Sequence, residues 1–156
     1  METNQIEIRR AGPNDASEIA RLLEDFNAEY DEPSPGVPLL TERLRPLLAR
    51  GEMTVLLAGD GPDGLSLFRH RPSLWVSGLE THLQELYVVP PLRGRGIGRA
   101  LLEATIAIAR EGGSKGIDLN TGETDTVARA LYERMGFTNR EGSPDGPSML
   151  FYEREI

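Results

Sequence analysis

The sequence predicts an α/β protein, a single domain over residues 1–156 with a mixed, largely antiparallel twisted sheet flanked by about four helices. Short runs of β-branched, aromatic or alternating apolar residues, typical of strands, take turns with segments whose apolar residues recur every three or four positions, typical of helices. Turns rich in glycine and proline separate these segments. No internal repeat, linker or low-complexity stretch divides the chain, which is long enough to bury one full core.

The first half of the chain predicts one strand, two helices and a hairpin. In order, we expect a strand over 6–10, a helix that starts near Asp15, a loop over 31–38, a helix over 39–50 and strands over 53–58 and 65–71. Asp15 and Glu18 have the spacing of an N-terminal capping box. The first helix presents one apolar face, for either the core or a substrate wall: Ile19, Leu22, Leu23, Phe26 and Tyr30. After Pro72, the segment 74–76 either continues the hairpin or bends away.

The second half predicts a strand within 78–90, a helix from Ile97 to about Arg110, a strand over 116–120, a helix over 125–135 and two final strands over 137–140 and 149–153. Gly112 and Gly113 form a clear stop for the helix that begins at Ile97. The apolar positions of that helix are 97, 100, 101, 104 and 108. Leu102 and Ile106 lie on its other side, so we expect burial on more than one face.

Composition excludes several kinds of site. The net charge is −8 and the isoelectric point about 4.8, which argues against a nucleic-acid partner and is compatible with a cationic small molecule. The absence of cysteine excludes disulfides, thiolate–zinc sites and an acyl-cysteine intermediate. With two histidines, we expect no metal. No apolar run has the length of a membrane span and the polar start, residues 1–5, resembles no signal peptide, so we expect a cytoplasmic protein without a membrane partner.

A glycine-rich turn between the strand within 78–90 and the next helix is the strongest functional signal. Gly94, Gly96 and Gly98 alternate with larger residues where the helix begins. A helix start offers free backbone N–H groups, and glycine lets phosphate oxygens approach them. Three arginines add positive charge, so a pyrophosphate is expected to bind over Arg93, Gly94, Arg95, Gly96, Ile97, Gly98 and Arg99. The alternative is a tight turn with surface arginines.

The glycine-rich turn differs from two common phosphate-binding motifs and resembles a third one. The chain has no Gly-x-x-x-x-Gly-Lys-Ser/Thr string, and the glycine period differs from the dinucleotide fingerprint Gly-x-Gly-x-x-Gly. The stretch 93–98 instead resembles the Arg/Gln-x-x-Gly-x-Gly/Ala signature of the GNAT superfamily of N-acetyltransferases, which bind acetyl-coenzyme A. The stretch 128–137 is similar to this family's Ala-x-x-x-Tyr-x-x-x-Gly-Phe. The likeness in element order extends from about Ile6 to Tyr152.

This resemblance implies roles for residues on both motifs. The strand before the turn is expected to bulge and part from its neighbour, so that backbone amides of Val88 and Val89 receive the pantetheine arm and the oxyanion. Tyr132 fits the family's general acid, which protonates the leaving thiolate; the alternative is a packing role on its helix. Asp125 stands where the family often has an asparagine that contacts the cofactor, and Asn120 is an alternative source of that amide.

The general base is less certain from sequence. Glu85 lies on the strand before the expected bulge, where some relatives place a carboxylate. His82 and Glu80 are alternatives on the same strand, and some family members use a water chain without a single base. Because successive strand residues face opposite sides, an error of one residue in register would remove Glu85 from the site.

The acceptor is expected to be a primary amine of a small cationic molecule, which attacks acetyl-CoA directly in a ternary complex. In this family the segment between the first two helices commonly forms one wall of the acceptor site, and here its start is acidic. We assign the acceptor wall to Phe26, Glu29, Tyr30 and Asp31; an ordinary solvated loop is the alternative. A protein N-terminus or lysine as acceptor, and a non-catalytic CoA-binding sensor, are the alternative functions. The resemblance also favours a homodimer.

Overall fold

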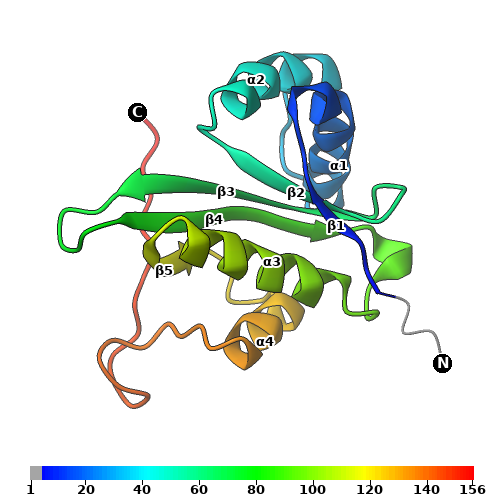
Figure 1. The fold of residues 1–156 in the computed structure, drawn as a ribbon. Helices are drawn as coiled ribbons and strands as arrows, with labels where there is room; N and C mark the ends of the chain where they lie inside the picture. The colour runs from blue at the N-terminus through cyan, green and yellow to red at the C-terminus, as the bar shows by residue number, and fades with distance from the viewer. Residues whose placement is uncertain (1–4) are drawn as a thin grey trace. The chain divides into compact units, whose positions relative to one another are not determined.

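The computed structural model describes residues 5–156, so the first four residues of the polar start lie outside the described part. The chain forms two compact units that divide after Leu119, and each is described by itself. The first unit is a five-stranded sheet with three helices (Figure 1). Its elements are β1 (Ile8–Arg10), η1 (Pro13–Asp15), α1 (Ala16–Glu29), α2 (Val37–Ala49), β2 (Thr54–Ala58), β3 (Gly64–Pro72), β4 (Leu79–Val88), η2 (Pro90–Leu92), α3 (Ile97–Glu111) and β5 (Ser114–Leu119).

The sheet follows chain order, β1-β2-β3-β4-β5. The first four strands pair antiparallel, and β5 joins β4 in parallel. A parallel neighbour requires a crossover connection, which α3 supplies between β4 and β5. The expected mixed, largely antiparallel sheet is therefore confirmed, as are four helices when the one in the second unit is included.

The two faces of the sheet are covered by different helices (Figure 1). On one face, Leu65 and Leu67 of β3 pack in a cluster with residues of α1 and α2, among them Ile19 and Leu44. On the other face, the buried Ser66 hydroxyl lies 2.8 Å from the hydroxyl of Thr105 on α3. β3 alternates regularly between these two environments, so its odd-numbered residues define the α1/α2 face and its even-numbered residues the α3 face.

The helix starts differ from expectation at two points. Asp15 precedes α1, but its carboxylate accepts the Gly12 N–H at 2.8 Å and pairs with Arg9, and it does not cap α1. The predicted capping box with Glu18 is therefore wrong, because the nearby arginine and the 3₁₀ turn of η1 take the carboxylate. The second helix begins at Val37, two residues earlier than predicted, because proline is well tolerated in a first helical turn and Pro38 fits there.

The buried stripe of α3 is rotated from the predicted one. Its buried residues are Ile97, Leu101, Leu102, Thr105 and Ala109. The prediction counted only apolar side chains, and it therefore missed Thr105, whose hydroxyl donates to the Leu101 carbonyl at 2.8 Å and meets Ser66 across the interface. Burial of a polar residue that satisfies its own hydrogen bonds cannot be read from hydrophobic periodicity.

The second unit contains α4 (Thr126–Arg134) followed by irregular chain. Asp125 is the residue before the helix, and its side chain accepts the Ala128 N–H at 3.3 Å, as an N-cap does. The two predicted final strands, 137–140 and 149–153, are wrong: a single bridge between Arg140 and Ser148 forms in their place. Two strands alone are marginal in water, and within this unit no third strand supports them.

Within residues 5–156, every helix is too short or too polar to span a bilayer.

Candidate active site

The second half of β4 loses one of its two neighbours. The parallel ladder with β5 runs from Leu79 to Leu83, where it ends opposite Leu119. β4 itself continues for five more residues to Val88, and in the described part of the chain these residues pair only with β3. The expectation that the two strands part before the glycine-rich turn agrees with this geometry. Backbone groups on the open side of this half-strand lack a ladder partner there.

A β-bulge at Gln84 changes which side chains share a face. Leu67 lies opposite Glu85 and Phe68 opposite Leu83, so Gln84 is the extra residue on β4. Paired residues point to the same side of a sheet. Glu85 therefore joins Leu67 on the α1/α2 face, although Leu83, two residues earlier, faces α3 with Phe68. The bulge precedes Glu85, whereas the sequence analysis placed it after this residue.

Glu85 is a partly buried carboxylate, and its side chain has no hydrogen-bond or ion-pair partner among residues 5–156. Burial raises the pKa of Glu85 above that of an ordinary glutamate, because desolvation penalises the charged form. A carboxyl group with a raised pKa and a free side chain has the properties of a general base.

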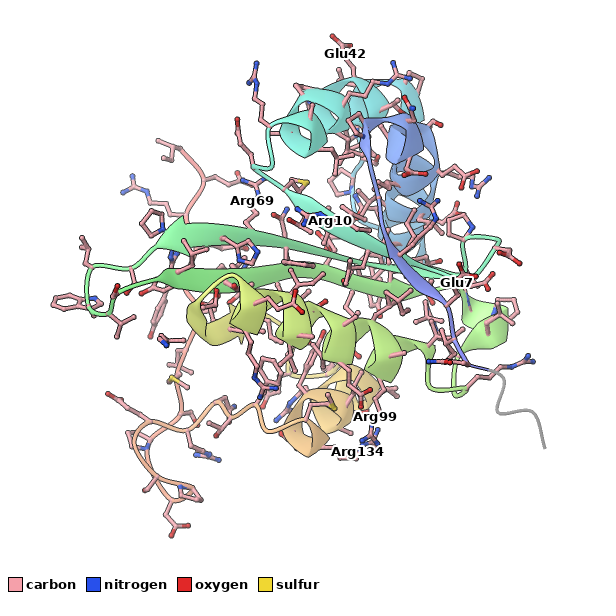
Figure 2. All side chains as sticks on the ribbon, viewed as in Figure 1. Glu7, Arg10, Glu42, Arg69, Arg99 and Arg134 are labelled. Atoms are coloured by element: carbon pink, nitrogen blue, oxygen red, sulfur yellow. The ribbon has the colours of Figure 1, made fainter. Side chains whose placement is uncertain are left out.

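His82 also lies on the α1/α2 face, opposite Arg69 in the ladder with β3. Figure 2 shows Arg69 on the side of the sheet that α2 covers and Arg99 on α3, on the other side. The Nδ1 atom of His82 makes a short contact with the carboxylate of Asp118 on β5. Glu80, the third candidate, is bonded to Arg71 at 2.8 Å. Both alternatives to Glu85 are therefore held by charged neighbours.

The backbone of β4 supports one of the two predicted amide sites and corrects the other. The Val89 N–H donates to the Asp63 carbonyl at 2.9 Å, so it is not free. Along an antiparallel ladder, every second residue forms hydrogen bonds with the partner strand. Val89 bonds toward β3, so the N–H and C=O groups of Val88 and Leu86 point away from β3, toward the open side. The Val88 carbonyl indeed accepts from Arg93 Nε at 2.9 Å. Leu86, which the sequence analysis did not single out, joins Val88 as a candidate donor.

The turn after β4 leads into the start of α3, which the sequence analysis expects to bind a pyrophosphate. Gly94 and Gly96 have φ values of 77° and 85°, which disfavour residues with a Cβ atom. Gly96 is the N-cap residue of α3, and among residues 5–156 no side chain caps this helix. Its first turn carries no acidic residue, so its N–H groups and partial positive charge can receive an anion. Arg99 bonds Glu103 at 2.9 Å on the helix surface, and Arg95 is exposed.

Arg93, which the sequence analysis assigned to phosphate, instead faces α1. Both terminal nitrogens of its guanidinium lie 2.6 Å from the carboxylate oxygens of Glu29, in a bidentate ion pair. Its Cζ atom lies 5.7 Å from the ring centre of Tyr87. The hydrogen bond from Arg93 lowers the pKa of Glu29, and Glu29 raises the pKa of Arg93. Two residues predicted to bind different substrates thus bind each other.

The predicted acceptor wall lies at the end of α1. Phe26 packs 5.0 Å from Tyr87 and 5.3 Å from Tyr30, measured between ring centres. Tyr30 is 53% exposed, whereas Phe26 is partly buried against the core. Asp31 adopts φ 54°, an uncommon conformation for a residue other than glycine, where the chain leaves the helix. An aromatic surface on α1 therefore adjoins Tyr87 of β4.

The second unit carries the other predicted residues. Tyr132 lies on α4, with its ring centre 5.9 Å from that of Phe137. Asp125 caps the same helix, and Asn120 lies at the start of the unit. The capping role of Asp125 is a structural one, which aspartate fills as well as asparagine. Contacts of these three residues with a cofactor stay predictions.

The sequence analysis misplaced the bulge of this site and missed two further features. The bulge at Gln84 and the open-side backbone of Leu86 have no local sequence signal. The pair between Glu29 and Arg93 joins residues 64 positions apart, so neither helical nor strand spacing could indicate it. No group of three or more acidic or histidine residues able to hold a metal is found in residues 5–156.

Comparison with known proteins identifies the family. The model of the acetyltransferase (GNAT) family matches residues 19–137, which is most of the chain. The chain belongs to the GNAT family. Within this family, it is 33% identical over 141 residues to an aminoglycoside N(6')-acetyltransferase type 1 from Stenotrophomonas maltophilia, covering 86% of this chain and 87% of the relative. It is 27% identical to a thialysine N-epsilon-acetyltransferase from Caenorhabditis elegans, covering 85% of this chain and 83% of the relative.

A solved structure matches along the whole chain. A protein described as an acetyltransferase from Arthrobacter sp. FB24 shares 42% sequence identity and a TM-score of 0.90, covering 100% of this chain and 99% of that protein. The predicted fold class and family membership are thereby confirmed, and the chain is an N-acetyltransferase whose relatives act on amines.

Proposed function

We propose that this GNAT protein transfers an acetyl group from acetyl-CoA to a primary amine of a small cationic molecule, by direct attack within a ternary complex. The observation that carries the proposal is Glu85, a partly buried carboxylate that the bulge turns to the α1/α2 face of the half-strand without a β5 neighbour. The start of α3, with free amides and no acidic residue, follows on the same segment. A base and an anion site are thus adjacent in the chain.

The cofactor would be held mainly by backbone. The pyrophosphate would lie on the amides of Arg95, Gly96, Ile97 and Gly98, with the side chains of Arg95 and Arg99 near its charges. We remove Arg93 from this set, because Glu29 and the Val88 carbonyl already use its donors. The pantetheine arm would bind the outward backbone groups of Leu86, because the Val88 carbonyl accepts from Arg93. In the second unit, Asn120 and Asp125 stay candidates for contacts with the nucleotide part. No metal takes part.

The chemistry needs three roles, and the proposal gives each a group. An alkyl ammonium has a pKa near 10, so the amine must lose a proton before it attacks. Glu85, as a carboxylate, accepts that proton directly or through water. The N–H of Val88 donates to the oxyanion that forms on the thioester carbonyl. Tyr132 donates its phenolic proton to the departing thiolate.

The acceptor would bind at the end of α1. Phe26 and Tyr30 supply an aromatic surface, and Asp31 supplies a negative charge for a cationic amine. Glu29, being paired with Arg93, contributes by position more than by charge. Relatives named for aminoglycoside and thialysine acetylation support a small amine as acceptor. The proposal retains a homodimer in the cytoplasm, which light scattering and cell fractionation would test.

The test is acetyl-CoA turnover against polyamines, aminoglycosides, amino acids and short peptides, with thiol release as the signal. Turnover with one class of small amine, reduced in Tyr132→Phe, would support the proposal and identify the class. Turnover with peptides alone would favour a protein acceptor. Binding of acetyl-CoA without turnover on any amine would favour a CoA-binding sensor, and a failure to bind acetyl-CoA would sink the cofactor assignment.

A further inference from the structure

The pair between Glu29 and Arg93 connects two parts of the proposed site that are far apart in sequence. Glu29 is the last residue of α1, and Arg93 follows η2 in the turn before α3. The side chains are 30% and 43% exposed, so the pair lies at the surface, where a single ion pair contributes little to stability. Its two parallel bonds of 2.6 Å fix the relative orientation of the two side chains, and this orientation matters more than the small gain in stability.

The guanidinium of Arg93 is fixed on three sides. Two nitrogens bind Glu29, and Nε donates to the Val88 carbonyl at the end of β4. The same group lies against the ring of Tyr87. Because the donors of a guanidinium form one rigid plane, Glu29 cannot shift without moving the turn or breaking the bidentate pair.

The segment after α1 is held mainly by α1 itself. The Glu32 N–H donates to the Asn27 carbonyl at 2.9 Å, and the Asn27 side-chain amide donates to the Pro33 carbonyl at 3.3 Å. The Ser34 hydroxyl makes a short contact with the Glu24 carboxylate. The position of residues 30–36 therefore follows the position of the last turns of α1. This segment includes Tyr30 and Asp31 of the proposed acceptor wall.

We infer that Glu29 and Arg93 are positioning residues whose ion pair couples the cofactor turn to the acceptor wall. The inference rests on the proposed function, because it takes the backbone from Arg95 to Gly98, which directly follows Arg93 and Gly94, as the cofactor site. CoA bound at the turn restricts the motion of Arg93. Through Glu29, the restriction passes to the end of α1 and to residues 30–36. The acceptor wall is thereby ordered before the amine binds, so that the cofactor promotes acceptor binding.

The experiment is hydrogen–deuterium exchange of the full chain with and without CoA, which requires no knowledge of the acceptor. In the wild type, CoA should slow exchange of the amides in residues 30–36 by about tenfold, within the usual range of coupling between sites. Glu29→Gln should abolish this slowing and leave the slowing at the start of α3 in place. Its affinity for CoA should change by less than about fivefold, the lower end of that range.

Two further variants keep the outcomes distinct. Glu42→Gln removes one acidic charge from α2, where Glu42 points away from the sheet, and should behave as the wild type (Figure 2). Arg93→Lys keeps the positive charge but cannot form a bidentate pair, so it should have the same effect as Glu29→Gln. It provides the test if Glu29→Gln does not fold. Equal slowing of residues 30–36 in the wild type and in the folded variants would overturn the coupling. A wild type that does not bind CoA would instead overturn the proposed function.

Discussion

β2 and the second half of β4 belong to one sheet and differ in every property that matters for function. β2 is paired along both edges, with β1 and β3, and all five of its residues are buried. The second half of β4 is paired only with β3, exposes Gln84 and carries a carboxylate in a partly buried place. The first region has strand partners on both edges, and the second leaves backbone groups and a side chain available. The sheet thus combines a fully buried strand with one half-strand whose pairing is incomplete and whose groups are available for binding.

The largest effect should come from removing the available carboxylate. Glu85→Gln should lower kcat by about 10²- to 10⁴-fold, the usual contribution of a general base. The same change should not lower the thermal midpoint near neutral pH, because burial raises the pKa of Glu85 and its ionised form costs stability there. Steady-state kinetics and calorimetry on the same preparation would measure both.

A parallel His82→Asn variant sharpens this result. It should reduce kcat much less than Glu85→Gln, since His82 is engaged by Asp118. If His82→Asn caused the larger loss, the assignment of the base to Glu85 would be wrong.

A smaller effect is expected on the α3 side of the sheet, where the polar groups are fully paired. Thr105 donates to the Leu101 carbonyl, so the Ser66 hydroxyl donates to Thr105. Thr105→Val leaves that buried hydroxyl without an acceptor and should lower the free energy of unfolding by about 1–3 kcal/mol. Adding Ser66→Ala to Thr105→Val should recover part of the loss, because no buried donor is then left unpaired. Urea unfolding of the two variants would measure both changes in stability. Equal stability of wild type and Thr105→Val would contradict the hydrogen bond between Ser66 and Thr105.

The smallest effect separates two glycines of the same turn. Gly96 has a positive φ, so Gly96→Ala should cost about 1–2 kcal/mol of backbone strain and weaken CoA binding by roughly tenfold. Gly98 lies inside α3, where alanine is the better helix former, and Gly98→Ala should leave the fold intact. Isothermal titration with CoA compares the two. Equal affinities for both variants would show that the turn conformation is not required for binding.

Much of the fold could be predicted because its signals are local. The strands β2 and β3, the start of α3 at Ile97 and the N-cap at Asp125 follow from short patterns of apolar residues and turn formers. The glycine-rich turn before α3 could also be predicted, since a run of glycines at a helix start has few structural explanations.

The rest of the site depends on partners distant in sequence. The bulge at Gln84 is defined only against β3, and it decides the face of Glu85. The sequence suggests a substrate contact for Glu29, because no neighbouring residue in the chain indicates that Glu29 pairs with Arg93. The final strands were expected from alternating residues, which indicate a capacity to pair and not the presence of a partner.

The pH dependence of kcat/KM, corrected for ionisation of the acceptor amine, tests whether Glu85 is the general base. A carboxylate accepts a proton only when it is ionised, so activity should rise with pH through the pKa of Glu85. Because burial raises that pKa, the rise should be centred above the usual range for glutamate, and Glu85→Gln should abolish it. A profile with the same rise in wild type and in Glu85→Gln would contradict the account.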